Sequence, residues 1–254
     1  MIKILKSIAV AFSLYSRIPM PKFTWASDDM RYHLIFFPFI GMIIAVAEYI
    51  LEIIYLNFGI NVNAFAALSL CIPILITGGF HIDGYMDTSD ALSSFQDKEK
   101  RLEILKDPHI GAFSVIQLVL LGLLLFAAII IMPPTVFHIW LFSFFISRAL
   151  SGICVVKMKN AKNTGLMNTE SETADKNIVF IFLILELVFA AIIALLINPI
   201  YTLVLILSEF IAFLYYRHIA YSKFGGITGD LAGYSVCISE LTSALFLAAV
   251  SLIF

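Results

Sequence analysis

Seven long apolar runs constrain this chain more than any other feature of its sequence. A membrane-spanning helix needs about 20 mostly apolar residues. Runs of about that length cover 34–56, 64–82, 112–132, 135–156, 178–197, 199–216 and 232–254. A segment in lipid must satisfy its backbone hydrogen bonds internally, so these runs predict helices. With no internal repeat, the sequence predicts an all-α, polytopic transmembrane helical bundle of about seven spans, with residues 1–254 as one integral-membrane domain.

The composition fits residence in a lipid bilayer. Hydrophobic residues make up 61% of the chain and charged residues only 13%, whereas soluble domains average about 25% charged residues. The net charge of −2 provides no electrostatic basis for binding nucleic acid. Cys71, Cys154 and Cys237 all lie inside apolar runs with no CxxC pattern, which favours buried thiols over a disulfide framework.

The N-terminal segment imitates a signal peptide, since Lys3 and Lys6 precede a short apolar stretch. Arg17 follows that stretch almost at once, however, and no small-residue cleavage site is present. We therefore expect residues 2–16 to form an uncleaved amphipathic helix that lies at the membrane interface.

Basic residues are confined to alternate loops. Of the 16 Lys and Arg residues, all but Arg148 lie in the N-terminal segment or in the loops after the second, fourth and sixth runs. The opposite loops, near 57–63, 133–134 and 198, contain no Lys or Arg. Cytoplasmic loops carry the excess of basic residues. The alternation therefore predicts a multi-pass protein of the cell (inner) membrane with its N-terminus inside and its C-terminus outside.

The unusual polar clusters fall on the predicted cytoplasmic side, and three aspartates form the sharpest of them. Asp83, Asp87 and Asp90 are spaced i, i+4, i+7, which places three carboxylates on one narrow face of a helix. Like charges stacked near a membrane repel one another and are costly to desolvate. A divalent cation relieves both penalties, and oxygen ligands suit Mg²⁺ or Mn²⁺. The alternative is a solvated acidic helix end.

Glycines and a histidine surround these carboxylates. Gly78 and Gly79 precede them, and glycine allows a diphosphate to approach the backbone closely. A plain acidic helix end does not explain such glycines. His81 is interpreted either as a substrate contact or as a residue that only orients Asp83, and the sequence leaves both open.

Two further loops carry candidate binding residues. Lys106 and Asp107 stand just before a proline that breaks the helical pattern. They are interpreted either as part of a loop placed at a helix mouth or as part of an ordinary charged loop. Gly225, Gly226 and Gly229, together with Thr228 and Asp230, open the last apolar run. A glycine-rich turn at a helix N-terminus is typical of an anion-binding site. Close helix packing is the alternative role for these glycines.

Acidic residues also occur inside the apolar runs. Glu240 lies in the last run, and an intramembrane acid is a functional candidate by default. Its alternatives are a neutral carboxyl group or an ion pair with Arg148. Four further glutamates without a neighbouring motif are interpreted as structural or interfacial: Glu48, Glu52, Glu186 and Glu209.

With these motifs in hand, the chain resembles the cobalamin synthase family, the adenosylcobinamide-GDP ribazoletransferases. Residues 77–91 match the family signature of a Gly pair, a His and three spaced Asp. The other matching motifs, in the family order, are residues 17–21, 38–41, 107–111, 147–148 and 225–230, followed by Glu240. The departures from the family pattern at Tyr85, Met86, Ala91 and Pro108 remove no carboxylate and concern packing or substrate detail.

The resemblance implies an enzyme that joins adenosylcobinamide-GDP to α-ribazole or its 5′-phosphate and releases GMP. It implies Mg²⁺ as cofactor, held by Asp83, Asp87 and Asp90. It also implies that Arg148 or Lys106 interacts with the negative charge of the phosphate groups. Asp230 or one of the motif aspartates would be the base for the attacking hydroxyl group. The glycines and the remaining polar residues of the matched motifs would contact the substrates, and the active site would face the cytoplasm. The lipid bilayer is an expected partner, and a homo-oligomer stays open.

Two other classes of protein compete with this interpretation. A CDP-alcohol phosphatidyltransferase shares the Asp-Gly start and the stacked aspartates. In this chain no Ala-Arg pair follows the Asp-Gly start, and no Gly-x3-Asp-x3-Asp occurs after it. A cation or metabolite transporter would carry polar groups at mid-membrane and on both faces, often with internal repeats. Here the polar groups crowd one face.

Overall fold

The computed structural model describes residues 2–21, 24, 26–162 and 165–253, and these residues form helices and connecting loops. The α-helices of this described part are α1 (Ile2–Tyr15), α2 (Phe37–Phe58), α3 (Val62–Thr77), α4 (Phe80–Ser93), α5 (Lys98–Ile104), α6 (Ala112–Ile131), α7 (Pro134–Trp140), α8 (Phe142–Lys157), α9 (Leu166–Thr173), α10 (Lys176–Ile197), α11 (Pro199–Ile219) and α12 (Gly229–Ser251). Short helical turns are η1 (Ser27–Met30), η2 (His33–Phe36) and the π-helical η3 (Ala220–Phe224). The predicted all-α class is confirmed.

Six helical segments in the described residues are long and apolar enough to cross a membrane. They are His33–Phe58, Ala112–Ile131, Pro134–Lys157, Lys176–Ile197, Pro199–Phe224 and Gly229–Ser251. The total becomes seven if the bent pair α3 and α4 counts as one span. The prediction of about seven spans is therefore confirmed, and the chain is a multi-pass membrane protein.

One predicted span has a different form. Residues 64–82 were expected to cross the membrane as one helix, but α3 ends at Thr77 and α4 leaves at an angle of 99°. Gly78 and Gly79 make this bend, with φ angles of 70° and 84°, a left-handed conformation that glycine adopts at little cost. The helix expected at 64–82 is therefore interrupted, because two successive left-handed residues break a helix that the apolar pattern alone would continue.

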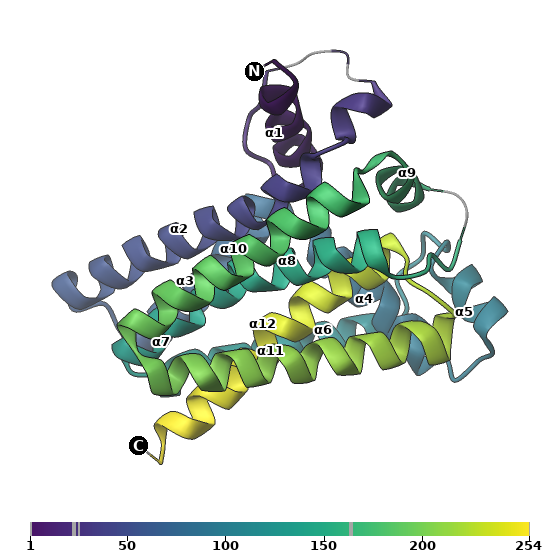
Figure 1. Cartoon of the computed structure of the whole chain (residues 1–254). Coiled ribbons are helices and arrows are strands. Elements are labelled where there is room, and N and C mark those ends of the chain that lie inside the picture. The colour runs from purple at the N-terminus through teal and green to yellow at the C-terminus, as the bar shows by residue number, and fades with distance from the viewer. Residues whose placement is uncertain (1, 22–23, 25, 163–164, 254) are drawn as a thin grey trace.

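Asn and Pro residues set the turns between the long helices. Asn198 ends α10 and its side chain accepts a hydrogen bond from the Tyr201 backbone at 3.2 Å, which caps the start of α11. The α6–α7 turn contains Pro133, and Pro134 opens α7. Figure 1 shows the α2–α3, α6–α7 and α10–α11 connections at one end of the bundle, with α5 and α9 at the other.

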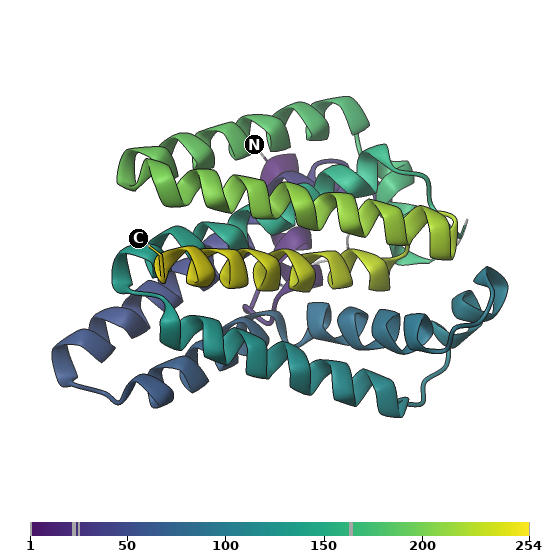
Figure 2. The same cartoon turned by 90° about the horizontal axis from the view of Figure 1, so that it is seen from below.

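The last helix occupies the centre of the bundle. Figure 2 shows α12 between α10 and α11 on one side and α4 and α6 on the other, and α12 contacts α4, α6, α8 and α11 directly. The segment formed by α7 and α8 is the most buried of the candidate spans, whereas most residues of α6 and α10 are exposed on the outside of the bundle. Helix α1 stands across the direction of the long helices (Figure 1). Residues 2–16 therefore do form a helix, and its position at the membrane interface stays a prediction.

Candidate active site

The bend between α3 and α4 positions the first turn of the aspartate helix. The backbone N–H of Arg17 donates to the Ile76 carbonyl at 2.8 Å, and the Arg17 side chain lies against Gly78, where an added Cβ would come within 2.5 Å of Nε. Gly79, by contrast, faces open space. Gly78 is therefore packed against the N-terminal segment, whereas the Gly79 backbone is engaged by the Thr77 hydroxyl group and the Asp83 N–H.

The three aspartates lie along α4, as their spacing predicts, but in different surroundings. Asp83 is exposed, whereas Asp87 and Asp90 are partly buried. The Asp90 carboxylate lies directly against Gly111 at the end of the α5–α6 loop, so closely that no Cβ would fit. The negative charges of Asp83, Asp90 and Asp230 all act on Asp87. The four carboxylates thus belong to one electrostatic group.

Asp230 joins this group because α4 and α12 cross in close contact. A Cβ on Gly84 would lie 2.6 Å from the Asp230 carbonyl oxygen, and a Cβ on Gly233 would lie 3.2 Å from the His81 carbonyl oxygen. Small residues at a crossing let two helix backbones approach each other in a membrane. The glycines therefore bring the second turn of α12 beside the aspartate face of α4.

A cavity of about 400 Å³ opens beside this crossing. One part of its lining is aromatic: the rings of Tyr15 and Phe37 lie 4.3 Å apart, and those of Phe80 and His81 5.5 Å apart. The other part is charged and contains Asp83, Lys106, Lys162 and Asp230. Such a cavity is large enough to enclose a small ligand.

The two lysines supply positive charge beside the carboxylates. Burial lowers the pKa of Lys162, the Asp230 carboxylate opposes that shift, and the Lys106 charge adds to it. Asp107, the neighbour of Lys106, is not brought into the cavity. Its carboxylate accepts from the backbone N–H of His109 at 3.0 Å and lies 2.6 Å from the ring Nδ1. These hydrogen bonds lower the pKa of Asp107 and stabilise the turn.

The glycine-rich turn before α12 divides into packed and open positions. A Cβ on Gly225 would lie 2.5 Å from Lys98 Nζ, and one on Gly226 would lie 2.5 Å from the Lys159 carbonyl oxygen. Thr228 caps α12 by accepting a hydrogen bond from the Leu231 N–H at 3.2 Å, and Gly229 faces open space. Thr228 and Gly229 line the cavity; Gly225 and Gly226 do not.

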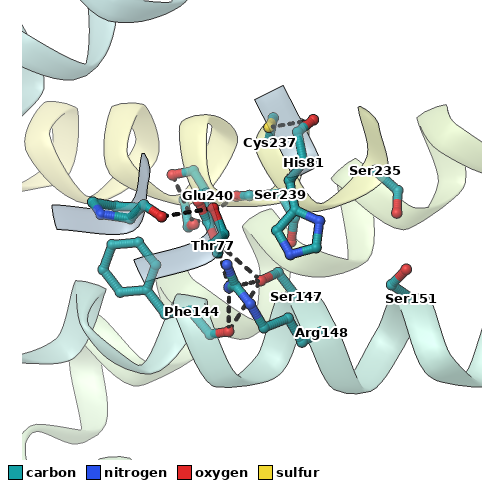
Figure 3. A network of polar contacts seen from close by, with 12 residues as sticks. Thr77, His81, Phe144, Ser147, Arg148, Ser151, Ser235, Cys237, Ser239 and Glu240 are labelled. Carbon is teal, nitrogen blue, oxygen red and sulfur yellow. Dashed lines mark hydrogen bonds and ion pairs between the residues drawn. The ribbon is translucent and has the colours of Figure 1, made fainter. Parts of the chain in front are cut away.

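Arg148 and Glu240 lie apart from the charged part of the cavity. Arg148 Nη1 donates to Glu240 Oε1 at 2.7 Å and to the Phe144 carbonyl at 2.7 Å (Figure 3). Both residues are buried, and they line a second, smaller cavity between α3, α6, α8 and α12. The ion pair that the sequence left open is therefore formed. His81 lines both cavities, and its buried Nε2 has no hydrogen-bond partner.

Sequence patterns did not identify much of the lining of the larger cavity, including its aromatic part and several polar groups. Lys162, Tyr15 and Glu170 contribute polar groups, and Phe37 forms part of the aromatic wall. Tyr15 and Glu170 are 155 positions apart yet hydrogen-bonded at 2.6 Å. No motif or spacing connects such distant positions. The only signal was a cluster of charge in the loop that contains Lys162.

The donor chemistry of the carboxylate group fits a hard divalent cation. Within the described part of the chain, no three His, Cys, Asp or Glu side chains converge on a preassembled metal site. Mg²⁺ typically keeps several waters and uses only one or two carboxylates plus substrate phosphates. The oxygen-only donor set of Asp83, Asp87 and Asp230 therefore suits Mg²⁺ bound together with a phosphorylated substrate.

Fold and site together define a class: a polytopic membrane protein with a carboxylate- and lysine-lined cavity at one end of its helical bundle. The sequence profile described as Cobalamin-5-phosphate synthase matches residues 7–248. The chain belongs to this family, whose members carry out the final condensation of cobalamin synthesis as transferases. The predicted resemblance is confirmed.

Similar curated proteins carry a consistent name. A protein of Lachnoclostridium phytofermentans named adenosylcobinamide-GDP ribazoletransferase is 44% identical over 243 residues, covering 96% of this chain and 93% of its own. Proteins with the same name from Clostridium perfringens, at 33% identity over 95% of this chain and 97% of theirs, and from Clostridioides difficile, at 27% identity over 96% and 97%, are also similar. No solved structure matches the chain.

Proposed function

We propose that this chain joins adenosylcobinamide-GDP to α-ribazole or its 5′-phosphate, giving adenosylcobalamin or its 5′-phosphate and GMP. The observation that carries the proposal is the α4–α12 crossing, which brings Asp83 and Asp230 together with two lysines around one cavity. The name of the relatives supports the substrates.

The reaction requires an in-line displacement at phosphorus. The ribazole 3′-hydroxyl group forms a new bond to the phosphorus next to cobinamide, the bond to the bridging oxygen breaks, and GMP leaves with that electron pair. Lys106 and Lys162 are placed to bind the phosphate oxygens, and charge stabilisation of this kind accounts for most of phosphoryl-transfer catalysis. Asp230, beside the aspartate face, is proposed to accept the proton of the attacking hydroxyl group.

We further propose that the enzyme depends on Mg²⁺. Asp83 and Asp87 would hold the cation, and Asp90, packed against Gly111, would complete the negative field around it. When bound, the cation would offset the negative charge that develops on the leaving GMP. The protein residues would keep Asp83 at the cavity with Asp87 close behind it, and would orient the diphosphate between these carboxylates and the lysines.

The orientation in the membrane is also a proposal. The basic loops and the cavity lie at the end of the bundle that carries α5 and α9 (Figure 1). By the positive-inside rule, this end would face the cytoplasm. We therefore propose a cell-membrane enzyme with a cytoplasmic active site. Its oligomeric state, including a homo-oligomer, is left to direct measurement.

A reconstituted assay tests the function. The purified protein in lipid nanodiscs is supplied with adenosylcobinamide-GDP and α-ribazole 5′-phosphate, with Mg²⁺ or with EDTA, and the products are separated by chromatography. We expect equal amounts of GMP and adenosylcobalamin 5′-phosphate with Mg²⁺, and neither product with EDTA. GMP release without a corrinoid product would instead indicate hydrolysis and contradict the proposed transfer.

A further inference from the structure

A buried carboxylate lies in the aromatic part of the cavity. Glu170 of α9 is 4% exposed, and its Oε1 accepts a hydrogen bond from Tyr15 Oη of α1 at 2.6 Å. Burial and the Glu170 carboxylate raise the pKa of Tyr15 well above its ordinary value, so its hydroxyl group stays protonated and donates. His33 also contacts this pair. Its Nε2 lies 3.5 Å from Glu170 Oε1, and its Nδ1 lies 2.5 Å from the Met30 carbonyl oxygen.

This carboxylate can accept more hydrogen bonds than the one that Tyr15 donates. A carboxylate has two oxygens and about four acceptor positions, and a buried polar group without a partner costs free energy. Tyr15 supplies one donor, and Glu170 also lines the cavity. A ligand base that carries N–H groups would supply the rest. The flanking rings of Tyr15, Phe37 and Phe80 would at the same time cover the apolar faces of that base.

We propose that this part of the cavity is a base-recognition subsite for a nucleotide whose base offers N–H donors, with Glu170 as the residue that selects it. The inference rests on the proposed function, which brings two nucleotides to the enzyme. One source of such a base is guanine, whose N1–H and amino group can pair with a carboxylate. The other is the entering nucleotide, if its base is adenine-like. Dimethylbenzimidazole in a glycosidic bond has no N–H donor and does not satisfy Glu170.

The size of the cavity agrees with one nucleotide. Its volume of about 400 Å³ is near the lower end of the range of small-molecule sites, about 300–1,000 Å³. Adenosylcobinamide-GDP contains a corrin ring, an adenosyl group and one guanosine nucleotide, so only its guanosine portion, or the separate entering nucleotide, can be enclosed. The corrin ring would lie outside the cavity.

Binding measurements with three probes test the subsite. GMP, α-ribazole 5′-phosphate and the corresponding α-adenine ribotide are titrated calorimetrically against the wild-type protein, Glu170→Gln and Tyr15→Phe in nanodiscs. Glu172→Gln is the matched control, because Glu172 is an exposed carboxylate of the same helix that accepts from Asn168. Melting temperatures are recorded for each variant, and turnover is measured separately.

We expect Glu170→Gln to weaken binding of one donor-bearing probe by about tenfold or more, since a hydrogen bond to a charged group is worth that much. Binding of α-ribazole 5′-phosphate and the behaviour of Glu172→Gln should stay unchanged. Loss confined to GMP assigns the subsite to guanine, and loss confined to the adenine ribotide assigns it to the entering base.

Unchanged affinity for both donor-bearing probes in both variants would overturn the inference. So would a lowered melting temperature with unchanged affinities, because Tyr15 and Glu170 would then only join α1 to α9. Neither result affects the proposed function if the wild-type protein still forms the corrinoid product. Absence of that product in the wild type would instead contradict the proposed function itself.

Discussion

At the scale of single residues, similar side chains have different roles because their surroundings differ. Asp83 faces the cavity, Asp90 lies against a loop glycine, and Asp107 holds a turn through His109. All three are aspartates of matched motifs. Their positions separate the carboxylates that can meet a substrate from those that support the site.

The aspartate face yields the first prediction. Asp83→Asn, Asp87→Asn and Asp90→Asn should each lower turnover by on the order of 10²-fold or more, because each removes charge that stabilises the transferring phosphoryl group. Turnover and its Mg²⁺ dependence are measured beside a melting curve. Near-normal turnover in two of the three variants, with unchanged Mg²⁺ dependence, would exclude a shared cation site.

The buried ion pair yields the second prediction. Removal of one partner leaves the other charge buried and unpaired, so Arg148→Met and Glu240→Leu should each destabilise the protein by about 3–5 kcal/mol. The double variant should recover part of this loss because no charge is left alone. Thermal unfolding in detergent checks both points. If each single variant melts like the wild type, the pair does not hold α8 against α12.

At the scale of elements, glycines decide how closely segments approach. Gly226 packs on the backbone of residues 159–161, where Ile227 N–H donates to the Lys159 carbonyl at 2.8 Å and Ala161 N–H donates to the Ile227 carbonyl at 2.9 Å. This pairing fixes the loop that carries Lys162 beside the start of α12. Gly226 therefore has a packing role, but against a loop rather than between two helices as the sequence analysis considered.

The contrast between packed and open glycines yields the third prediction. Gly226→Ala should lower the melting temperature, because its Cβ would lie 2.5 Å from the Lys159 carbonyl oxygen. A Cβ added at Gly229 would have no atom within 4 Å. The Gly229→Ala protein should therefore fold normally and differ only in its affinity for the nucleotide. Melting curves and GMP titrations separate the two effects. If the Gly226→Ala protein melts normally but binds GMP weakly, the result would instead support a direct contact between Gly226 and the phosphate.

At the scale of the whole molecule, the outer surface of the helical bundle is apolar and suits contact with lipid. Helices α6 and α10 expose most of their apolar side chains, which a bilayer accommodates and water does not. The basic loops collect at the end that bears the cavity. The proposed sidedness and the proposed chemistry are thus linked, because a cytoplasmic substrate would require a cavity that opens to the cytoplasm.

This arrangement yields the fourth prediction. In a background without Cys71, Cys154 and Cys237, Ile60→Cys and Asn198→Cys should react with a membrane-impermeant maleimide on intact cells. Lys98→Cys and Lys223→Cys should react only after permeabilisation, because basic loops stay in the cytoplasm. Labelling is read by mass shift on gels. External labelling at position 98 or 223 would contradict both the sidedness and the cytoplasmic cavity.

Local pattern was enough to predict helices, their approximate ends and the aspartate face. Apolar length and helical period are properties of consecutive residues, so the spans and the i, i+4, i+7 stacking of Asp83, Asp87 and Asp90 followed directly. The bend at Gly78–Gly79 was missed because the apolar pattern continues through it while the backbone does not.

The tertiary structure alone decided which distant residues meet. The Arg148–Glu240 pair spans 92 positions and the Tyr15–Glu170 bond spans 155, distances along the chain over which periodicity carries no information. Helices in lipid associate through close packing and polar contacts, since lipid tails are as apolar as the helix surfaces. The sequence therefore determined a multi-pass membrane transferase of this family, whereas side-chain fit between helices determined which groups line its cavity.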